Sequence, residues 1–158
     1  MRWDLIEKFE MIKKGRVAKA FRNFSGHEDF FAEHFPGNPL VPEPLLIEMI
    51  AQAGGVLFGL GLDFKKEVIL AKILKADFFE AARPPCRLVV EARLDEEREE
   101  GAWISGTVKA GSQMTAKATL LLVTLDSLQE NKTKIVFNDD FLEHFDIYNV
   151  AKASEENA

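Results

Sequence analysis

The sequence is poor in cysteine, tyrosine and concentrated positive charge, and each shortage narrows the possible functions. The single cysteine, Cys86, excludes an intrachain disulfide and any multi-thiolate metal site within one chain. No long basic run with interleaved aromatic residues is present, so nucleic acid is not the expected partner. One tyrosine stands against 13 phenylalanines, which indicates that the aromatic side chains mainly line the core or a pocket.

Long uninterrupted apolar runs are also missing. The N-terminal segment is charged throughout, and Glu48 and Gln52 interrupt the longest apolar stretch, so neither a signal peptide nor a membrane span is expected. The length of 158 residues, with 47% apolar and 29% charged residues, is typical of one soluble domain with a substantial core. We therefore expect a cytoplasmic protein.

Negative charge is concentrated at the C-terminal end. The formal net charge is −6, and residues 126–158 hold 8 of the 26 acidic residues but only 3 of the 20 basic ones. We predict a folded domain over residues 1–125 and an acidic C-terminal extension over 126–158, partly disordered or containing one short helix. Between Lys65 and Arg93 basic residues outnumber acidic ones, which would suit an acidic protein partner.

Proline and glycine predict a stiff loop followed by a buried helix. The loop from His34 to Pro44 holds four of the six prolines, which remove backbone donors and restrict the preceding residues. Pro44 suits the first turn of a helix, which we expect to end near Leu60. Apart from Glu48 and Gln52 this helix has no polar face, so the rest of the chain must wrap it on nearly all sides.

Alternation of apolar and polar residues predicts the strands that wrap the helix. They fall at residues 16–25, 68–78, 86–94, 104–110 and 114–125, with turns at 95–101 and 111–112. Residues 4–14 have the spacing of a short amphipathic helix. The simplest architecture is an α+β fold, with one long buried helix inside a curved antiparallel sheet.

Glu48 and His34 are the candidates for acid and base chemistry. Glu48 lies on the second turn of the predicted helix, where desolvation favours the protonated form that a general acid needs. His34 can exchange a proton near neutral pH and would be the complementary base. Gln52 lies on the same helix face and can orient the carboxyl group. A buried glutamate and a proline-rich turn are each common structural features, but their combination is more specific.

Other candidate sites are weaker. His27, Glu28 and His34 carry metal-ligating atoms, but nothing in their spacing brings them to one face, so no metal site is predicted. Cys86 begins a predicted strand and is interpreted as a small buried apolar residue rather than a nucleophile. The glycines at 54, 55, 59 and 61 lack the strand-loop-helix order of a phosphate-binding loop, and we expect them to allow close contact between helix and sheet.

The segment HFPGNPLVPEPLLIEMIAQAGG, residues 34–55, resembles the signature of the beta-hydroxyacyl-acyl-carrier-protein dehydratases, the FabZ and FabA family with the hot-dog fold. The stretches EDFFAEHF before it and KADFFEAARPPCRLVVEARL after it extend the resemblance over residues 16–125. His34 matches the family's catalytic histidine, and Glu48 its catalytic carboxylate at the same separation.

The resemblance also assigns roles at the substrate site. By position, the Glu43 amide would bind the thioester and the Leu40 carbonyl would orient the histidine ring, while Phe35, Gly37 and Gln52 complete the substrate-binding residues. A family member would be a hydro-lyase that dehydrates 3-hydroxyacyl groups, carried on the phosphopantetheine of acyl carrier protein, to trans-2-enoyl thioesters in fatty acid or related lipid or polyene synthesis. It would use neither metal nor cofactor. It would form a homodimer or a trimer of dimers, with His34 of one subunit facing Glu48 of the other.

One departure from the family pattern keeps other functions open. The chain has Pro42, Glu43 and Pro44 where the family has Pro-Gly, so the oxyanion site lacks glycine's backbone freedom. We expect the Glu43 side chain to point outward. A non-catalytic subunit that binds acyl thioesters or acyl carrier protein is therefore an alternative. A hot-dog thioesterase is a weaker one, because the His34 loop and its separation from Glu48 match the dehydratases.

Overall fold

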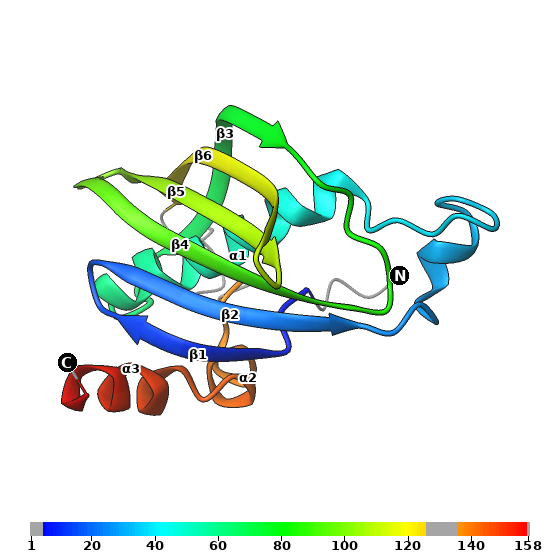
Figure 1. Cartoon of the computed structure of the whole chain (residues 1–158). Coiled ribbons are helices and arrows are strands. Elements are labelled where there is room, and N and C mark those ends of the chain that lie inside the picture. The colour runs from blue at the N-terminus through cyan, green and yellow to red at the C-terminus, as the bar shows by residue number, and fades with distance from the viewer. Residues whose placement is uncertain (1–4, 126–135, 158) are drawn as a thin grey trace.

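The computed structural model describes residues 5–125 and 136–157, in which one antiparallel sheet curves around a long helix (Figure 1). The sheet has six strands in the order β1-β2-β4-β5-β6-β3. The strands are β1 (Lys8–Lys13), β2 (Val17–Phe24), β3 (Glu67–Phe78), β4 (Cys86–Arg98), β5 (Gly101–Ala110) and β6 (Gln113–Leu125). The helices are the short 3-10 turn η1 (Asp29–Ala32), α1 (Glu43–Gly61), α2 (Asp139–His144) and α3 (Ile147–Glu156). The expected α+β hot-dog architecture is confirmed.

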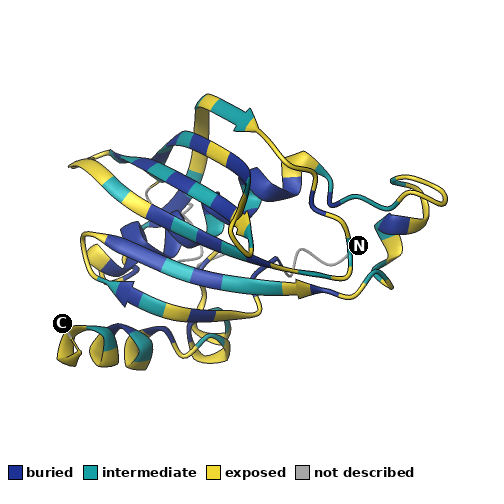
Figure 2. Ribbon diagram, viewed as in Figure 1, coloured by how far each residue is buried: buried dark blue, intermediate teal, exposed yellow. Residues whose placement is uncertain are grey.

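Helix α1 lies inside the curve of the sheet because almost all of its surface is apolar. Fourteen of its 19 residues are buried, and Figure 2 shows much of the helix in the colour of buried residues. Pro44 lies in the first turn, as predicted, where its missing N–H costs no hydrogen bond. By length and composition alone α1 could cross a membrane, but most of it is buried within the fold, as expected of a core helix.

Two glycines bring α1 and β5 into close contact. A Cβ atom on Gly54 would lie 2.7 Å from Cγ2 of Ile104, and a Cβ atom on Gly106 would overlap the side chain of Ile50. Each glycine thus leaves the space that an isoleucine of the opposite element fills. This packing sets both the distance and the rotation of the helix against the sheet.

The amphipathic helix predicted for residues 4–14 is wrong, because this segment contains strand β1. Phe9 and Ile12 are both fully buried, although in a regular strand residues three apart point to opposite faces. A register shift between Phe9 and Met11 opposite β2 accounts for the spacing. The bulge therefore places two apolar residues at a spacing that resembles one face of a helix.

The turn predicted over residues 95–101 is also shorter than expected. Strand β4 continues to Arg98 and pairs with Gly101 at the start of β5. The last four residues of β4, Asp95 to Arg98, are charged and exposed, so this end of β4 has no buried face to produce alternation. Backbone pairing alone extends the strands there.

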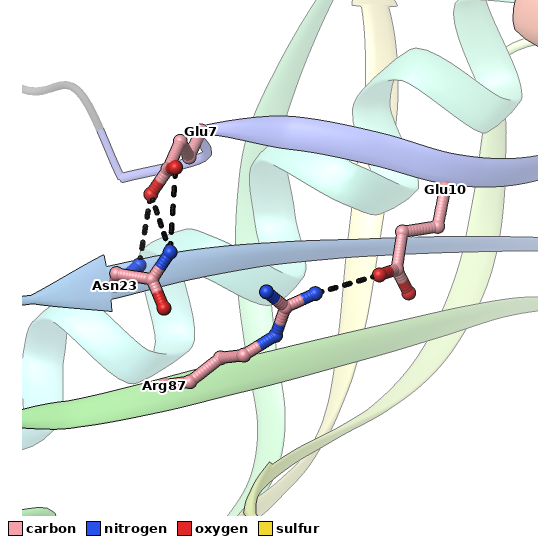
Figure 3. A network of polar contacts seen from close by, with 4 residues as sticks. All are labelled: Glu7, Glu10, Asn23 and Arg87. Atoms are coloured by element: carbon pink, nitrogen blue, oxygen red, sulfur yellow. Dashed lines mark hydrogen bonds and ion pairs between the residues drawn. The ribbon is translucent and has the colours of Figure 1, made fainter.

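Polar contacts across the outer face hold β1 against the rest of the sheet (Figure 3). The Glu7 carboxylate accepts hydrogen bonds from the backbone N–H of Asn23 at 3.0 Å and from its side-chain amide. Arg87 of β4 reaches across β2 to Glu10 at 2.8 Å, and its guanidinium lies over the Phe21 ring. These contacts help to hold β1 in place at the edge of the sheet.

The C-terminal extension contains two helices, where the sequence predicted at most one. In Figure 1, α3 lies alongside β1, and Ser154 of α3 accepts a hydrogen bond from the backbone N–H of Ile12 at 3.0 Å. Among the described residues of the extension, the buried side chains are Phe137, Leu142, Ile147 and Ala151. This part of the extension therefore belongs to the main core. The rest of the predicted extension, residues 126–135 and 158, lies outside the described residues.

Gly54→Ala tests the close approach of α1 and β5. The added methyl group would collide with Ile104, so we expect the free energy of unfolding to fall by roughly 1–3 kcal/mol. Gly61→Ala is the matched control on the same helix, because it meets nothing closer than 3.9 Å and should be neutral or stabilising by about 0.5 kcal/mol. Urea unfolding measures both, and equal effects would contradict the prediction.

Candidate functional site

The loop that carries His34 is stiffened by its own backbone hydrogen bonds. Phe35 and Asn38 exchange N–H to carbonyl bonds of 3.1 and 2.9 Å, and Leu40 N–H donates to the His34 carbonyl at 3.0 Å. Gly37 has a φ of +71°, a conformation that L side chains rarely adopt, so the turn requires glycine. The loop is thus a rigid platform for the histidine.

The His34 ring is oriented by the contact that the family resemblance implied. Its Nδ1 atom lies 3.3 Å from the Leu40 carbonyl oxygen, and the ring stacks on Phe35 with 4.1 Å between centroids. A carbonyl can only accept a hydrogen bond, so in this contact Nδ1 carries the hydrogen, and in the neutral ring Nε2 then keeps the lone pair. The half-buried ring is therefore oriented to accept a proton at Nε2.

Glu48 lies on α1 with its carboxyl group held by a neighbouring amide. Gln52 Nε2 donates to Glu48 Oε1 at 3.0 Å, as predicted for residues one turn apart on the same face. Both side chains are half-buried, whereas the other residues of this part of the helix are almost all buried. The desolvation of Glu48 within one chain is therefore smaller than the sequence predicted.

A pocket of about 290 Å³ lies beside Glu48. One side is formed by α1 and the other by strands and the C-terminal segment; the lining residues are Glu48, Ala51, Gln52, Gly55, Val68, Ile69, Leu70, Leu122, Val136, Phe137 and Phe141. Apart from the carboxyl and amide groups of α1, the lining side chains are apolar. The pocket thus pairs one proton-exchanging group with an apolar space.

His34 and Glu48 are not brought together within one chain. His34 is absent from the pocket lining, and the hydrogen bonds of the described residues include none between the two side chains. Figure 1 shows that the segment between β2 and α1 projects away from the sheet and helix. The two halves of the predicted acid and base pair therefore belong to separate parts of the surface.

The N-terminus of α1 offers one backbone donor, the N–H of Glu43. Glu43 is the first residue of the helix, so its N–H has no partner within the helix. Its side chain is exposed, in agreement with the outward direction expected from the sequence. A helix N-terminus favours negative charge on a nearby oxygen.

Glu28 holds the turn that leads into the His34 loop. Its carboxylate accepts from the N–H groups of Ser25 and Gly26 at 3.0 and 2.9 Å and from the Ser25 hydroxyl at 3.2 Å. Partial burial alone would raise the pKa of Glu28, but these hydrogen bonds outweigh it and lower the pKa below its ordinary value. Glu28 is thus engaged in local structure.

Cys86 is not suited to act as a nucleophile. Burial raises the pKa of its thiol, and the negative charge of Glu28 raises it further. The thiolate form is therefore disfavoured, which agrees with the prediction that Cys86 is not a nucleophile. The residue is half-buried, however, and not buried as predicted.

Two features of the site were missed by sequence reasoning. Arg83, between β3 and β4, donates to the Asn38 side chain and so touches the His34 loop. Phe137 and Phe141 of the extension line the Glu48 pocket. Their spacing of four residues is typical of one helix face, but no pattern in the extension indicates which surface they cover.

Comparison with known proteins identifies the family of this fold and site. The FabA-like domain model matches residues 3–119. The chain belongs to the FabA-like family. The family match ends before the last residues of β6, so the C-terminal extension lies outside it.

The relatives of this FabA-like protein include dehydratases. The chain is 31% identical over 120 residues to the 3-hydroxyacyl-acyl-carrier-protein dehydratase FabZ of Caldanaerobacter subterraneus subsp. tengcongensis. This alignment covers 75% of the chain and 85% of that protein. The chain is 34% identical over 126 residues to FabZ of Chlamydia caviae, covering 78% and 80%. A hypothetical thioesterase of Streptococcus pneumoniae, solved with coenzyme A, shares the fold at 12% identity with a TM-score of 0.60, covering 76% and 89%.

Glu28→Gln tests the anchoring of the loop through its pH dependence. The folded-state pKa of Glu28 lies below its ordinary value of 4.5, so its stabilisation is complete above that pH and is lost as the pH falls through the folded-state pKa. Urea unfolding should show wild type more stable than the variant at neutral pH, with the difference closing as the pH falls below 4.5. A difference that stays constant with pH would contradict this role.

Proposed function

We propose that this FabA-like protein dehydrates 3-hydroxyacyl groups on acyl carrier protein to trans-2-enoyl thioesters, in fatty acid or related lipid synthesis in the cytoplasm. The proposal rests on the positions of two side chains, His34 and Glu48. His34 is oriented through Nδ1 by the Leu40 carbonyl, and Glu48 is held by Gln52 beside an apolar pocket. Family membership and the dehydratase relatives support it.

In this mechanism His34 and Glu48 act on adjacent carbons of the substrate. Nε2 of His34 takes the proton from C2, and the electron pair of that bond forms the C2–C3 double bond. Glu48 acts in its protonated form and gives its proton to the C3 hydroxyl, which leaves as water. The N–H of Glu43 and the positive end of α1 stabilise the charge that develops on the thioester oxygen.

We propose that a second copy of the chain completes the site. Strand β3 is an edge of the sheet, and its Leu70 and Ile73 side chains are 36% and 48% exposed. An exposed apolar edge strand is suited to pairing with another strand. A symmetric homodimer, alone or within a trimer of dimers, would bring His34 of one subunit to Glu48 of the other.

Two other functions remain as alternatives with their own observations. The Pro42-Glu43-Pro44 sequence at the oxyanion site favours a non-catalytic subunit that binds acyl thioesters or their carrier. The fold shared with a thioesterase solved with coenzyme A favours thioester hydrolysis. Carrier binding without turnover would support the first alternative, and release of free thiol without enoyl product would support the second.

Activity of the purified protein tests the proposed function and its two catalytic residues. Dehydration of 3-hydroxyacyl thioesters, followed by enoyl absorbance, should fall by at least about 100-fold in Glu48→Gln and in His34→Ala, because each removes a proton-transfer group. Dehydration by wild type that neither substitution reduces would overturn the assignment of these residues. Absence of dehydration at every chain length would overturn the function itself.

Mixing the two inactive variants tests the shared site. In a dimer of one Glu48→Gln and one His34→Ala subunit, one site has both substitutions and the other has neither. Random reassembly should therefore restore about a quarter of the wild-type activity. If both groups of a site came from one chain, the mixture would stay inactive.

We also propose that the acyl carrier protein docks at Lys65 and Lys66. In the basic segment of the sequence, Lys75, Arg87 and Arg93 are engaged by neighbouring carboxylates. Lys65→Glu with Lys66→Glu should raise the apparent KM several-fold for carrier-bound substrate and leave short thioester mimics unaffected. Lys13→Glu with Lys14→Glu, a pair of the same exposure at the β1–β2 turn, is the control. Equal effects on both substrates, or in both pairs, would contradict this docking site.

A further inference from the structure

The C-terminal segment forms one wall of the pocket beside Glu48. Val136, Phe137 and Phe141 meet α1 and the strands there, although the family match ends at residue 119. The shape of this pocket is therefore set in part by residues that the FabA-like domain does not contain.

Phe137 lies directly on the backbone of α1. A Cβ atom on Gly55 would lie 2.8 Å from Cζ of the Phe137 ring and 3.1 Å from Cε2. The Phe137 side chain is only 7% exposed. Gly55 thus provides the space that this ring fills, and the ring closes the pocket at the Gly55 level of the helix.

The distance from Glu48 to this wall limits what the pocket can hold. Glu48 and Gly55 are seven residues apart on α1, which corresponds to about 10 Å along the helix axis. A fully extended chain of single bonds advances about 3.5 Å for every three bonds. An acyl chain of roughly nine bonds therefore fits between the level of Glu48 and the level of Gly55. The volume of 290 Å³ is also small for a ligand pocket, since these range from about 300 to 1,000 Å³.

The wall is anchored at several points. The backbone N–H of Val136 donates to Glu67 Oε2 at 3.1 Å, and Glu67 is itself buried. The Phe137 ring packs edge-on against Phe64 with 5.9 Å between centroids, and it packs in a tilted orientation against Phe141 at 5.0 Å. Asn138 caps α2 by accepting from the Phe141 N–H at 2.9 Å. A wall held in this way resists displacement by a longer chain.

We propose that Phe137, supported by Phe141, determines the acyl-chain length that this protein accepts. The proposal rests on the proposed function, because it takes the pocket beside Glu48 as the acyl site. With C3 of the substrate at Glu48, the remaining chain reaches Phe137 after about nine bonds. The preferred substrates are therefore 3-hydroxyacyl thioesters of up to about 12 carbons, and longer chains meet the Phe137 ring.

Phe137→Ala and the milder Phe137→Leu test the proposal. The assay compares kcat/KM over 3-hydroxyacyl-pantetheine thioesters of about four to about 16 carbons. The ratio of long-chain to short-chain kcat/KM should rise about tenfold or more in Phe137→Ala and less in Phe137→Leu, which keeps more of the packing. A parallel change at every chain length in both variants would overturn the proposal, because it would indicate a structural role alone.

Tyr148→Ala is the matched control. Tyr148 belongs to the same extension and packs edge-on against Phe64 at 6.0 Å, but it is 51% exposed and does not line the pocket. Its loss weakens an anchor of the extension without removing the wall. The long-to-short ratio should stay at the wild-type value. A rise equal to that of Phe137→Ala would overturn the specific role of Phe137.

A binding measurement separates this inference from the proposed function. Calorimetry with unreactive 3-hydroxyacyl-pantetheine amides should show affinity rising roughly fourfold for each added methylene, until the wild-type pocket is full. In Phe137→Ala the rise should continue to longer chains. If the chain length of highest affinity shifts upward in Phe137→Ala but wild type shows no dehydration, the inference about Phe137 is supported and the catalytic proposal is refuted. If wild type dehydrates its substrates but the chain-length limit of binding does not shift in Phe137→Ala, the catalytic proposal is supported and the inference about Phe137 is refuted.

Discussion

The packing of α1 against the inner face of the curved sheet determines where the chemistry can occur. Gly54 faces Ile104 and Gly106 faces Ile50, so the helix can adopt only one rotation against β5. In that rotation Glu48 and Gln52 lie at the border of the core, half-buried and next to an open pocket. The contact that stabilises the fold therefore also decides which helix face carries the polar groups.

The other half of the site depends on a rigid loop rather than on the core. The backbone bonds around Phe35 and Asn38 hold the His34 ring against the Leu40 carbonyl, and the loop projects from the body of the protein. A projecting loop and a helix face at the edge of the core suit a site assembled from two copies. The precision of such a site would come from rigid parts that meet at an interface, not from one continuous pocket.

The C-terminal extension adds a third contribution to the same helix face. Its Phe137 covers Gly55, two turns from Glu48. The phenylalanines of the extension join the core through Phe64 and Phe9. The FabA-like domain supplies the common framework and the candidate acid and base, whereas the extension changes the space beside them. The space beside Glu48 thus depends on residues outside the framework as well as on the framework itself.

The sequence by itself determined the elements whose signals are local. Proline at 44 and the apolar run after it predicted α1 to within one residue at each end, and alternation predicted the strands that have one buried face. A carboxylate on an apolar helix and a histidine in a proline-rich loop indicated Glu48 and His34 as the candidate pair, and the family resemblance assigned their roles. Local patterns failed at β1, where a bulge imitates helical spacing, and at the charged end of β4, where only backbone pairing extends the strand. The tertiary structure alone decided that Glu48 is half-buried, that His34 lies apart from it in one chain, and that Phe137 covers Gly55. These features depend on contacts between residues far apart in the chain, and no local pattern of residues specifies them.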